Sequence, residues 1–252
     1  MKNYFLLILI LFSSFYSCNN PDTTDYSLTP EEYLELGMPD YNKVWSLDDY
    51  QMAFLVLNTL KYNQPKALPS RNSGKSAVVF SRMINIDNLA FLQDETLALH
   101  DKAEIIQWYG STLVELTAAF TFLGMEKQYY IRELTDIDIF SVTIAQTMLD
   151  LGNKINESED PEDIALQSDF PLIQKMYLDL ISSLLEKQEH PSLYPEETLE
   201  LLSDNLSTSI RRNMHWFDED ASERIKQALL TVIDSSSSRK LINDYQKLAG
   251  TL

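Results

Sequence analysis

The sequence has little cysteine and little glycine. Its 252 residues include one cysteine, Cys18, so no disulfide can form within the chain. Only 6 glycines are present, which disfavours a turn-rich β fold and favours helices. The apolar run from Tyr4 to Phe12 is also too short to span a membrane as a helix, which needs about 20 residues. Because no disulfide can form within the chain, its stability must come from packing alone.

Basic residues are scarce relative to acidic ones. The chain has 20 Lys and Arg against 38 Asp and Glu, a formal net charge of -18. An acidic surface repels phosphate backbones, so we expect no nucleic-acid partner. Because 44% of the residues are hydrophobic and 11% are aromatic, the body of the chain has enough apolar material to form a packed core.

The N-terminus has the layout of an export signal. Lys2 precedes the apolar run, and small polar residues follow it up to Cys18. The stretch Phe15-Tyr16-Ser17-Cys18 resembles a relaxed bacterial lipobox, in which the cysteine is acylated and becomes the first mature residue. The alternative is an ordinary secretory signal with an incidental cysteine. We predict a signal peptide over 1–17, a polar tether over 18–28 and a lipid-anchored protein of the cell envelope, at the outer membrane on its periplasmic or surface face.

Helix signals run through the rest of the chain. Thr29-Pro30-Glu31-Glu32 and the stretch from Ser46 to Asp49 each read as a cap with acids in the first turn. No strand-like alternation is seen. We predict an all-α fold, a single bundle of about seven or eight helices in one domain over 29–252.

Two long helices form the predicted centre. The first, over about 101–123, has apolar residues on nearly every face, and we expect it to be buried and to end at Gly124. The second, over about 126–151, is expected to end at Gly152. Because the link between them is short, they should be antiparallel neighbours. Further helices are predicted over 171–189, 196–214, around Ile225, and from the serine run at 235–238 to Leu248.

Glu115 is the first candidate site residue, since it is the only charged residue between Ser111 and Met125. In a central helix its carboxylate would be partly buried. It would then either form an ion pair with a cation or have its pKa raised by burial. A buried ion pair explains such a residue more simply than catalysis does. By contrast, the acidic residues Glu133, Asp136 and Asp138 are expected on a solvated helix face.

A short basic and aromatic cluster supplies the other candidate binding residues, which are Arg211, Arg212, His215 and Trp216. It could receive an anion or a carboxylate of a partner. Cations at a helix C-terminus with a packed tryptophan are the simpler explanation.

Metal and nucleotide sites are not indicated. His100 with Glu104, or His215 with Asp218 and Glu219, could give two ligands, but a zinc site needs three or four with a defined spacing. The stretch from Asn72 to Ser76 has Pro69 where a phosphate loop requires glycine. We expect no cofactor and no metal.

The order of features from about Ala67 to Asn156 resembles a family of uncharacterised all-helical lipoproteins of Bacteroidota. The shared marks are Leu68-Pro69-Ser70, Lys102-Ala103 leading to Tyr109-Gly110, and a long helix ending Leu151-Gly152. The family has an acid two residues after the first glycine, where this chain has Thr112. The resemblance implies the fold and the compartment, and no activity.

The resulting functional hypothesis is a non-catalytic binding or scaffolding protein held at the membrane by acylated Cys18, whose partner is another envelope protein or a small ligand. Two alternatives remain open. One is an immunity or inhibitor lipoprotein with an acidic binding face, and the other is an enzyme that uses a buried carboxylate such as Glu115.

Overall fold

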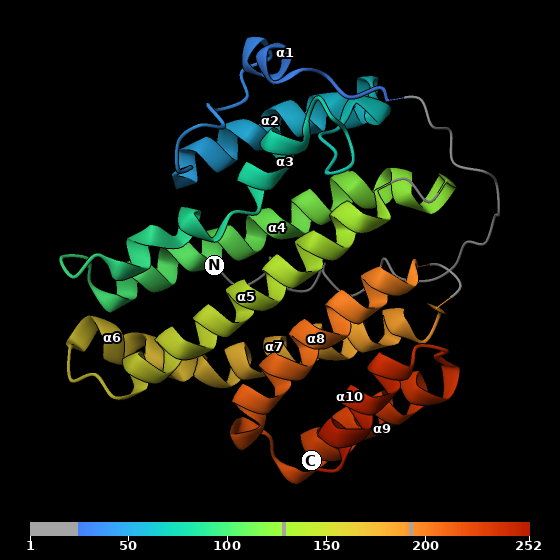
Figure 1. The fold of residues 1–252 in the computed structure, drawn as a ribbon. Coiled ribbons are helices and arrows are strands. Elements are labelled where there is room, and N and C mark those ends of the chain that lie inside the picture. The colour runs from blue at the N-terminus through green and yellow to red at the C-terminus, as the bar shows by residue number, and fades with distance from the viewer. Residues whose placement is uncertain (1–24, 128–129, 192–193) are drawn as a thin grey trace. The chain divides into compact units, whose positions relative to one another are not determined.

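The protein is all-α over the part that the structure, a computed structural model, describes: residues 25–127, 130–191 and 194–252. No strand occurs in these ranges. The α-helices (Figure 1) are α1 (Pro30–Glu35), α2 (Leu47–Asn63), α3 (Ala77–Met83), α4 (Leu99–Lys127), α5 (Ile131–Asn156), α6 (Pro161–Leu166), α7 (Phe170–Gln188), α8 (Glu196–Asn213), α9 (Glu219–Ser235) and α10 (Arg239–Ala249). Short 3-10 helices are η2 (Pro65–Ala67), η3 (Ile86–Gln93), η4 (Gln167–Asp169) and η6 (Met214–Trp216).

The predicted all-α class is confirmed, and the helices exceed the seven or eight expected because short ones add to the long ones. α1 and α6 have 6 residues each. Helices this short have too few turns to show an apolar period, so in the sequence α1 is signalled only by its cap at Thr29.

The predicted helix starts are confirmed by side-chain caps. Thr29 and Ser46 each form a capping box, with Glu32 and Asp49 as the reciprocal acids. These contacts satisfy backbone N–H groups that have no partner within the helix. Gly37 stops α1 with a φ of 93°, a left-handed conformation that glycine adopts without strain.

The predicted ends of the two long helices are wrong. α4 continues through Gly124 to Lys127, and α5 continues through Gly152 to Asn156. One glycine costs a helix only about 1 kcal/mol relative to alanine, so it need not end one. Gly152 has a packing role instead, because a Cβ built on it would lie 2.5 Å from Cδ2 of Phe170.

The chain divides into two compact units. Unit 1 comprises residues 1–85 and 111–134, and unit 2 comprises residues 86–110 and 135–252. One boundary, at residues 85/86, falls between α3 and η3, and the other two fall inside α4 and α5. The single domain predicted over 29–252 stays a prediction.

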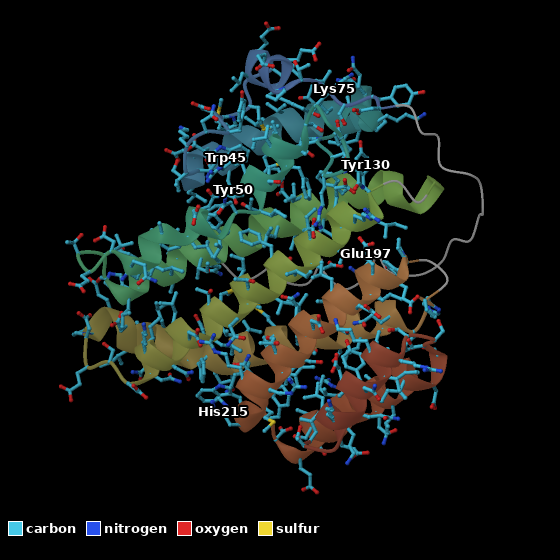
Figure 2. All side chains as sticks on the ribbon, viewed as in Figure 1. Trp45, Tyr50, Lys75, Tyr130, Glu197 and His215 are labelled. Carbon is cyan, nitrogen blue, oxygen red and sulfur yellow. The ribbon has the colours of Figure 1, made fainter. Side chains whose placement is uncertain are left out.

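Aromatic side chains from helices and loops fill the core of unit 1. Trp45 and Tyr50, labelled in Figure 2, are buried and meet edge to face at 5.6 Å between ring centroids. The hydroxyl of Tyr50 donates to the carbonyl of Met83, and that of Tyr33 donates to the carbonyl of Ala67 at 2.6 Å. These bonds attach the segment after α2 and the end of α3 to the core.

The core of unit 2 is an aliphatic cluster between its C-terminal helices. α10 packs against α8 and α9, and α7 packs against α9 (Figure 1). Fully buried members of this cluster include Ile181, Leu206, Ile225, Leu229 and Val232. In the part of α4 that belongs to unit 2, Gly110 lies against Ile144 and Met148 of α5, so the predicted contact between the two long helices is present.

The expectation that α4 is covered on all faces is wrong. Ile106, Tyr109 and Leu116 are buried, whereas Trp108 and Val114 are exposed. The apolar residues that encircle the helix in sequence therefore do not all face protein.

Candidate functional site

The predicted lipidation site, Cys18, and the apolar run before it lie outside the described residues. None of the helices described by the structure is long and apolar enough to cross a membrane.

Glu115 is exposed on α4, so the expectation of a partly buried carboxylate is wrong. On the same helix, Thr112 and Leu116 point into the core of unit 1 and line a cavity of about 10 Å³, which is about the space of one water molecule at most. Glu115 is not among the residues that line this cavity. The catalytic hypothesis built on Glu115 loses its geometric support.

The cluster at the end of α8 is only partly brought together. Arg212 contacts Asp150 at 2.7 Å, while Arg211 is exposed. The rings of His215 and Trp216 lie 4.6 Å apart, and Trp216 meets Phe170 edge to face at 5.5 Å. His215 is labelled in Figure 2 at the end of α8. The main feature of the cluster is therefore the pair of aromatic rings. It does not bring several cations together in the way that an anion site would require.

Trp216 lies in an open hollow of about 380 Å³ on unit 2. The lining residues come from α7, η6 and the start of α9: Pro171, Gln174, Lys175, Leu178, Trp216, Asp218, Asp220, Ala221 and Arg224. Trp216, Leu178, Pro171 and Ala221 are its apolar lining residues, and two carboxylates and two cations line it as well.

The two cations of the hollow share one carboxylate. Lys175 bonds to Asp179 one turn away on α7, and Arg224 reaches the same carboxylate at 3.9 Å. On the other side, Asp218 accepts from the backbone N–H of Ala221 at 2.7 Å and caps α9, and Asp220 is exposed. The hollow therefore offers an indole and two carboxylates to an incoming group, beside two cations that are paired to Asp179.

Two acids expected on a solvated face are in fact buried. Asp138 of α5 receives both bonds of Lys187 from α7, at 2.9 and 2.8 Å. Burial raises the pKa of Asp138, and the charge and hydrogen bonds of Lys187 oppose that rise. The mostly buried amine of Lys187 therefore offsets only part of the desolvation of the carboxylate.

Glu133 is the second, in unit 1. Its carboxylate accepts from the hydroxyl of Ser70 at 2.6 Å and from the backbone N–H of Arg71 at 2.8 Å. It thereby fixes the loop between η2 and α3. Sequence reasoning missed both acids because their partners are remote, 49 residues away for Asp138 and 63 for the Ser70 bond of Glu133.

A polar network crosses the core of unit 2. Gln146 and Asn213 exchange two bonds between their side-chain amides, at 3.0 and 2.8 Å. Ser209 donates to Gln146 at 3.1 Å and lies 2.7 Å from the hydroxyl of Tyr177. Each member is bonded, which is the condition for a buried polar group to be tolerated. The network specifies the register of α5, α7 and α8.

His100 has acidic neighbours, but the sequence identified the wrong one. Its Nε2 lies 2.7 Å from Oε2 of Glu162, and its Nδ1 lies 3.3 Å from Oδ1 of Asp163. Burial acts to lower the pKa of His100, but the bond to Asp163 and the charges of Glu162, Asp101 and Asp163 outweigh it and raise that pKa. Within the described ranges no group of three or more His, Cys, Asp or Glu is arranged to hold a metal ion.

The charge of the chain is very unevenly divided. Unit 2 has 27 of the 38 acidic residues and 11 of the 20 basic ones, a formal charge of -16. The residues of unit 1 therefore have a formal charge of -2, or -3 without Lys2 of the predicted signal peptide. The charges are visible in the sequence, but their uneven division appears only when the residues are assigned to the two units.

Comparisons with protein-family models, with curated proteins and with solved structures found no match. The resemblance to helical lipoproteins of Bacteroidota stays a prediction, and the site is interpreted from its own chemistry.

Proposed function

We propose that this protein is a lipid-anchored component of the cell envelope that binds, without catalysis, a partner protein through a basic surface of that partner. The observation that carries the proposal is the division of charge. Nearly all the net negative charge belongs to unit 2, and the predicted anchor belongs to the sequence of the unit that is almost neutral. A strongly charged surface accelerates encounter with a partner of opposite charge and rejects partners of like charge.

The hollow at Trp216 supplies a contact that suits such a partner. A lysine or arginine side chain can lay its aliphatic stem on Leu178 and its cation over the indole, with Asp218 and Asp220 close by. Cation–π attraction is strongest for tryptophan, and tryptophan is enriched among the residues that dominate binding energy at interfaces.

The acidic unit also keeps the inhibitor alternative open, since a basic toxin is one form of a basic partner. The immunity role and the envelope scaffold differ only in what the partner does. The present geometry supports their shared chemistry, an acidic surface with an aromatic hollow.

The test is quantitative capture of the anchored protein after cross-linking in intact cells, comparing wild type with Trp216→Ala. We expect Trp216→Ala to lower recovery of the main partner at least tenfold, as the loss of a central interface tryptophan does. Recovery in the absence of cross-linker should also fall steeply with added salt.

The matched control is Leu230→Ala, which removes an exposed apolar side chain from α9 away from the hollow. It should leave recovery unchanged. Equal recovery from all three proteins, or recovery that does not respond to salt, would contradict the proposal.

A further inference from the structure

One segment of this acidic chain has no acidic residue. From Tyr50 to Ile86 there is no Asp or Glu, and the basic residues there are Lys61, Lys66, Arg71, Lys75 and Arg82. Through the fold, Asp25 accepts a bond from Ser73 of this segment and Glu133 accepts from Ser70. Lys75 of the segment also acts on Glu32. Within the segment itself, every charged side chain is a cation.

The same segment presents an apolar helix face to solvent. On α2, Met52, Leu55 and Tyr62 are 49%, 66% and 74% exposed. With Thr59, also exposed, they are spaced by three, four and three residues, which places them on one side of the helix. The opposite side of α2 is buried in unit 1 through Phe54, Leu57 and Leu60, among others. We call the exposed residues 52, 55, 59 and 62 the outer stripe of α2.

The N-terminal end of the described chain is attached beside this helix. The ammonium of Lys66, three residues after α2, lies 4.4 Å from the ring centroid of Tyr26. Asp25 accepts from the hydroxyl of Ser73 at 2.8 Å, and Figure 1 shows the described chain beginning at the C-terminal end of α2. Burial acts to raise the pKa of Asp25, but bonds from Ser73 and Ser27 and the charge of Lys75, labelled in Figure 2, lower it.

The distance from the anchor follows from chain geometry. Seven residue steps separate Cys18 from Asp25, and a fully extended chain covers about 3.6 Å per step, so the two Cα atoms are at most about 25 Å apart. An acylated Cys18 sits at the membrane surface. The C-terminal end of α2 is therefore held within reach of that surface.

We propose that the outer stripe of α2 lies in the interface of the membrane that holds the anchor, at the level between lipid headgroups and acyl chains. This inference rests on the acylation of Cys18 in the proposed function. The exposed Tyr26 and Tyr62 are amphipathic aromatics of the kind enriched at this depth. Lys61, whose ammonium lies 5.4 Å from the ring centroid of Tyr62, can extend its stem along the apolar surface and keep its charge among the phosphates.

Charge favours a lipid surface over a second copy of this chain that pairs through the same stripe, because the two basic segments would then repel each other. Anionic headgroups attract a basic segment within a Debye length, and the segment from 50 to 86 is the long stretch of this chain that lacks acids. The acidic surface of unit 2 is repelled by the same headgroups. Exposed apolar and basic residues next to a lipid tether match the two-signal pattern of stable membrane attachment.

The experiment uses the full acylated protein reconstituted in vesicles of phosphatidylethanolamine and phosphatidylglycerol that contain a doxyl-labelled quencher lipid. Because acylated Cys18 has no free thiol, a new cysteine is the single site for an environment-sensitive fluorophore. Thr59→Cys places it in the outer stripe and removes no apolar side chain. Thr208→Cys is the matched control, an exposed helical threonine of unit 2 that bonds to the carbonyl four residues back, as Thr59 does.

We expect blue-shifted emission and quenching several times stronger at position 59 than at position 208. Adding Leu55→Asp to the Thr59→Cys protein should reduce the quenching at 59, because an exposed carboxylate is repelled from the interface. Leu230→Asp, on unit 2, should not.

Equal quenching at 59 and 208 in protein that still floats with the vesicles would overturn the inference and leave the anchor intact. A blue shift at 59 without lipid quenching would show that protein covers the stripe, which also overturns it. Loss of flotation of the unlabelled protein would overturn the anchor, and this inference with it.

Discussion

At the residue scale, two glycines inside helices have opposite roles. A Cβ on Gly152 of α5 would lie 2.5 Å from the ring of Phe170, whereas a Cβ on Gly110 of α4 would meet Ile144 and Met148 at 3.9 Å, an ordinary contact distance. Gly152 allows α7 to begin close against α5. Gly110 has no such constraint and only adds freedom to the unfolded chain.

Gly152→Ala should therefore lower the free energy of unfolding by about 1–3 kcal/mol, the usual cost of an overpacked contact. Gly110→Ala should raise it by about 0.5–1 kcal/mol through better helix propensity. Urea denaturation of the two variants and the wild type measures both changes. A stabilising effect of Gly152→Ala would contradict the close packing against Phe170.

Residue-level prediction succeeded where the cause was local. The caps at Thr29 and Ser46 were predictable because a capping box has all its partners within three residues. The burial of Asp138 and Glu133 was not predictable, because Lys187 and Ser70 are distant in sequence. For Glu115 the prediction was partial burial, and the residue is exposed. An apolar surrounding sequence does not show which face of a helix other helices cover.

At the element scale, the helices themselves were largely predictable, and their ends were not. α7 and α8 begin and end within about two residues of the predicted positions. The ends of α4 and α5 were missed because a glycine was taken as a stop, whereas packing and continued backbone bonding decided the matter. The hollow at Trp216 could not be predicted from the sequence either, because it forms only where α7 and α9 pack together.

The contact between α4 and α6 is an element-scale device that responds to pH. His100 at the start of α4 contacts Glu162 and Asp163 of α6, and Asp163 also accepts from the hydroxyl of Ser158 at 2.6 Å. Because the folded-state pKa of His100 is raised, its stabilisation is complete below the unfolded pKa of about 6.5. It is lost as the pH rises through the folded-state value.

The prediction is that His100→Gln costs most stability near pH 5.5, and that the difference from wild type shrinks as the pH rises above 7. Denaturation curves at a series of pH values measure it. Glu104→Gln, the acid one turn from His100 on α4, should leave the pH dependence of the wild type in place. A His100→Gln difference that is constant with pH would rule out the charged contact with α6.

At the scale of the whole molecule, the two units have different proposed roles: unit 1 attaches the protein to the membrane, and unit 2 binds the partner. Unit 1 has the predicted acyl site, a segment without acids and an exposed apolar stripe, while unit 2 has a formal charge of -16. Net charge and anchor motif could be read from the sequence. The division of that charge could not, since each unit is assembled from two separate stretches of chain.

The central claim is attachment through Cys18, and labelled palmitate tests it most directly. Cells that express the wild type or Cys18→Ser are grown with the label, fractionated and probed for the protein. The account predicts label in the wild type alone, and Cys18→Ser protein that lacks label and leaves the membrane fraction. An unlabelled wild type, together with a Cys18→Ser variant that stays in the membrane fraction, would contradict it.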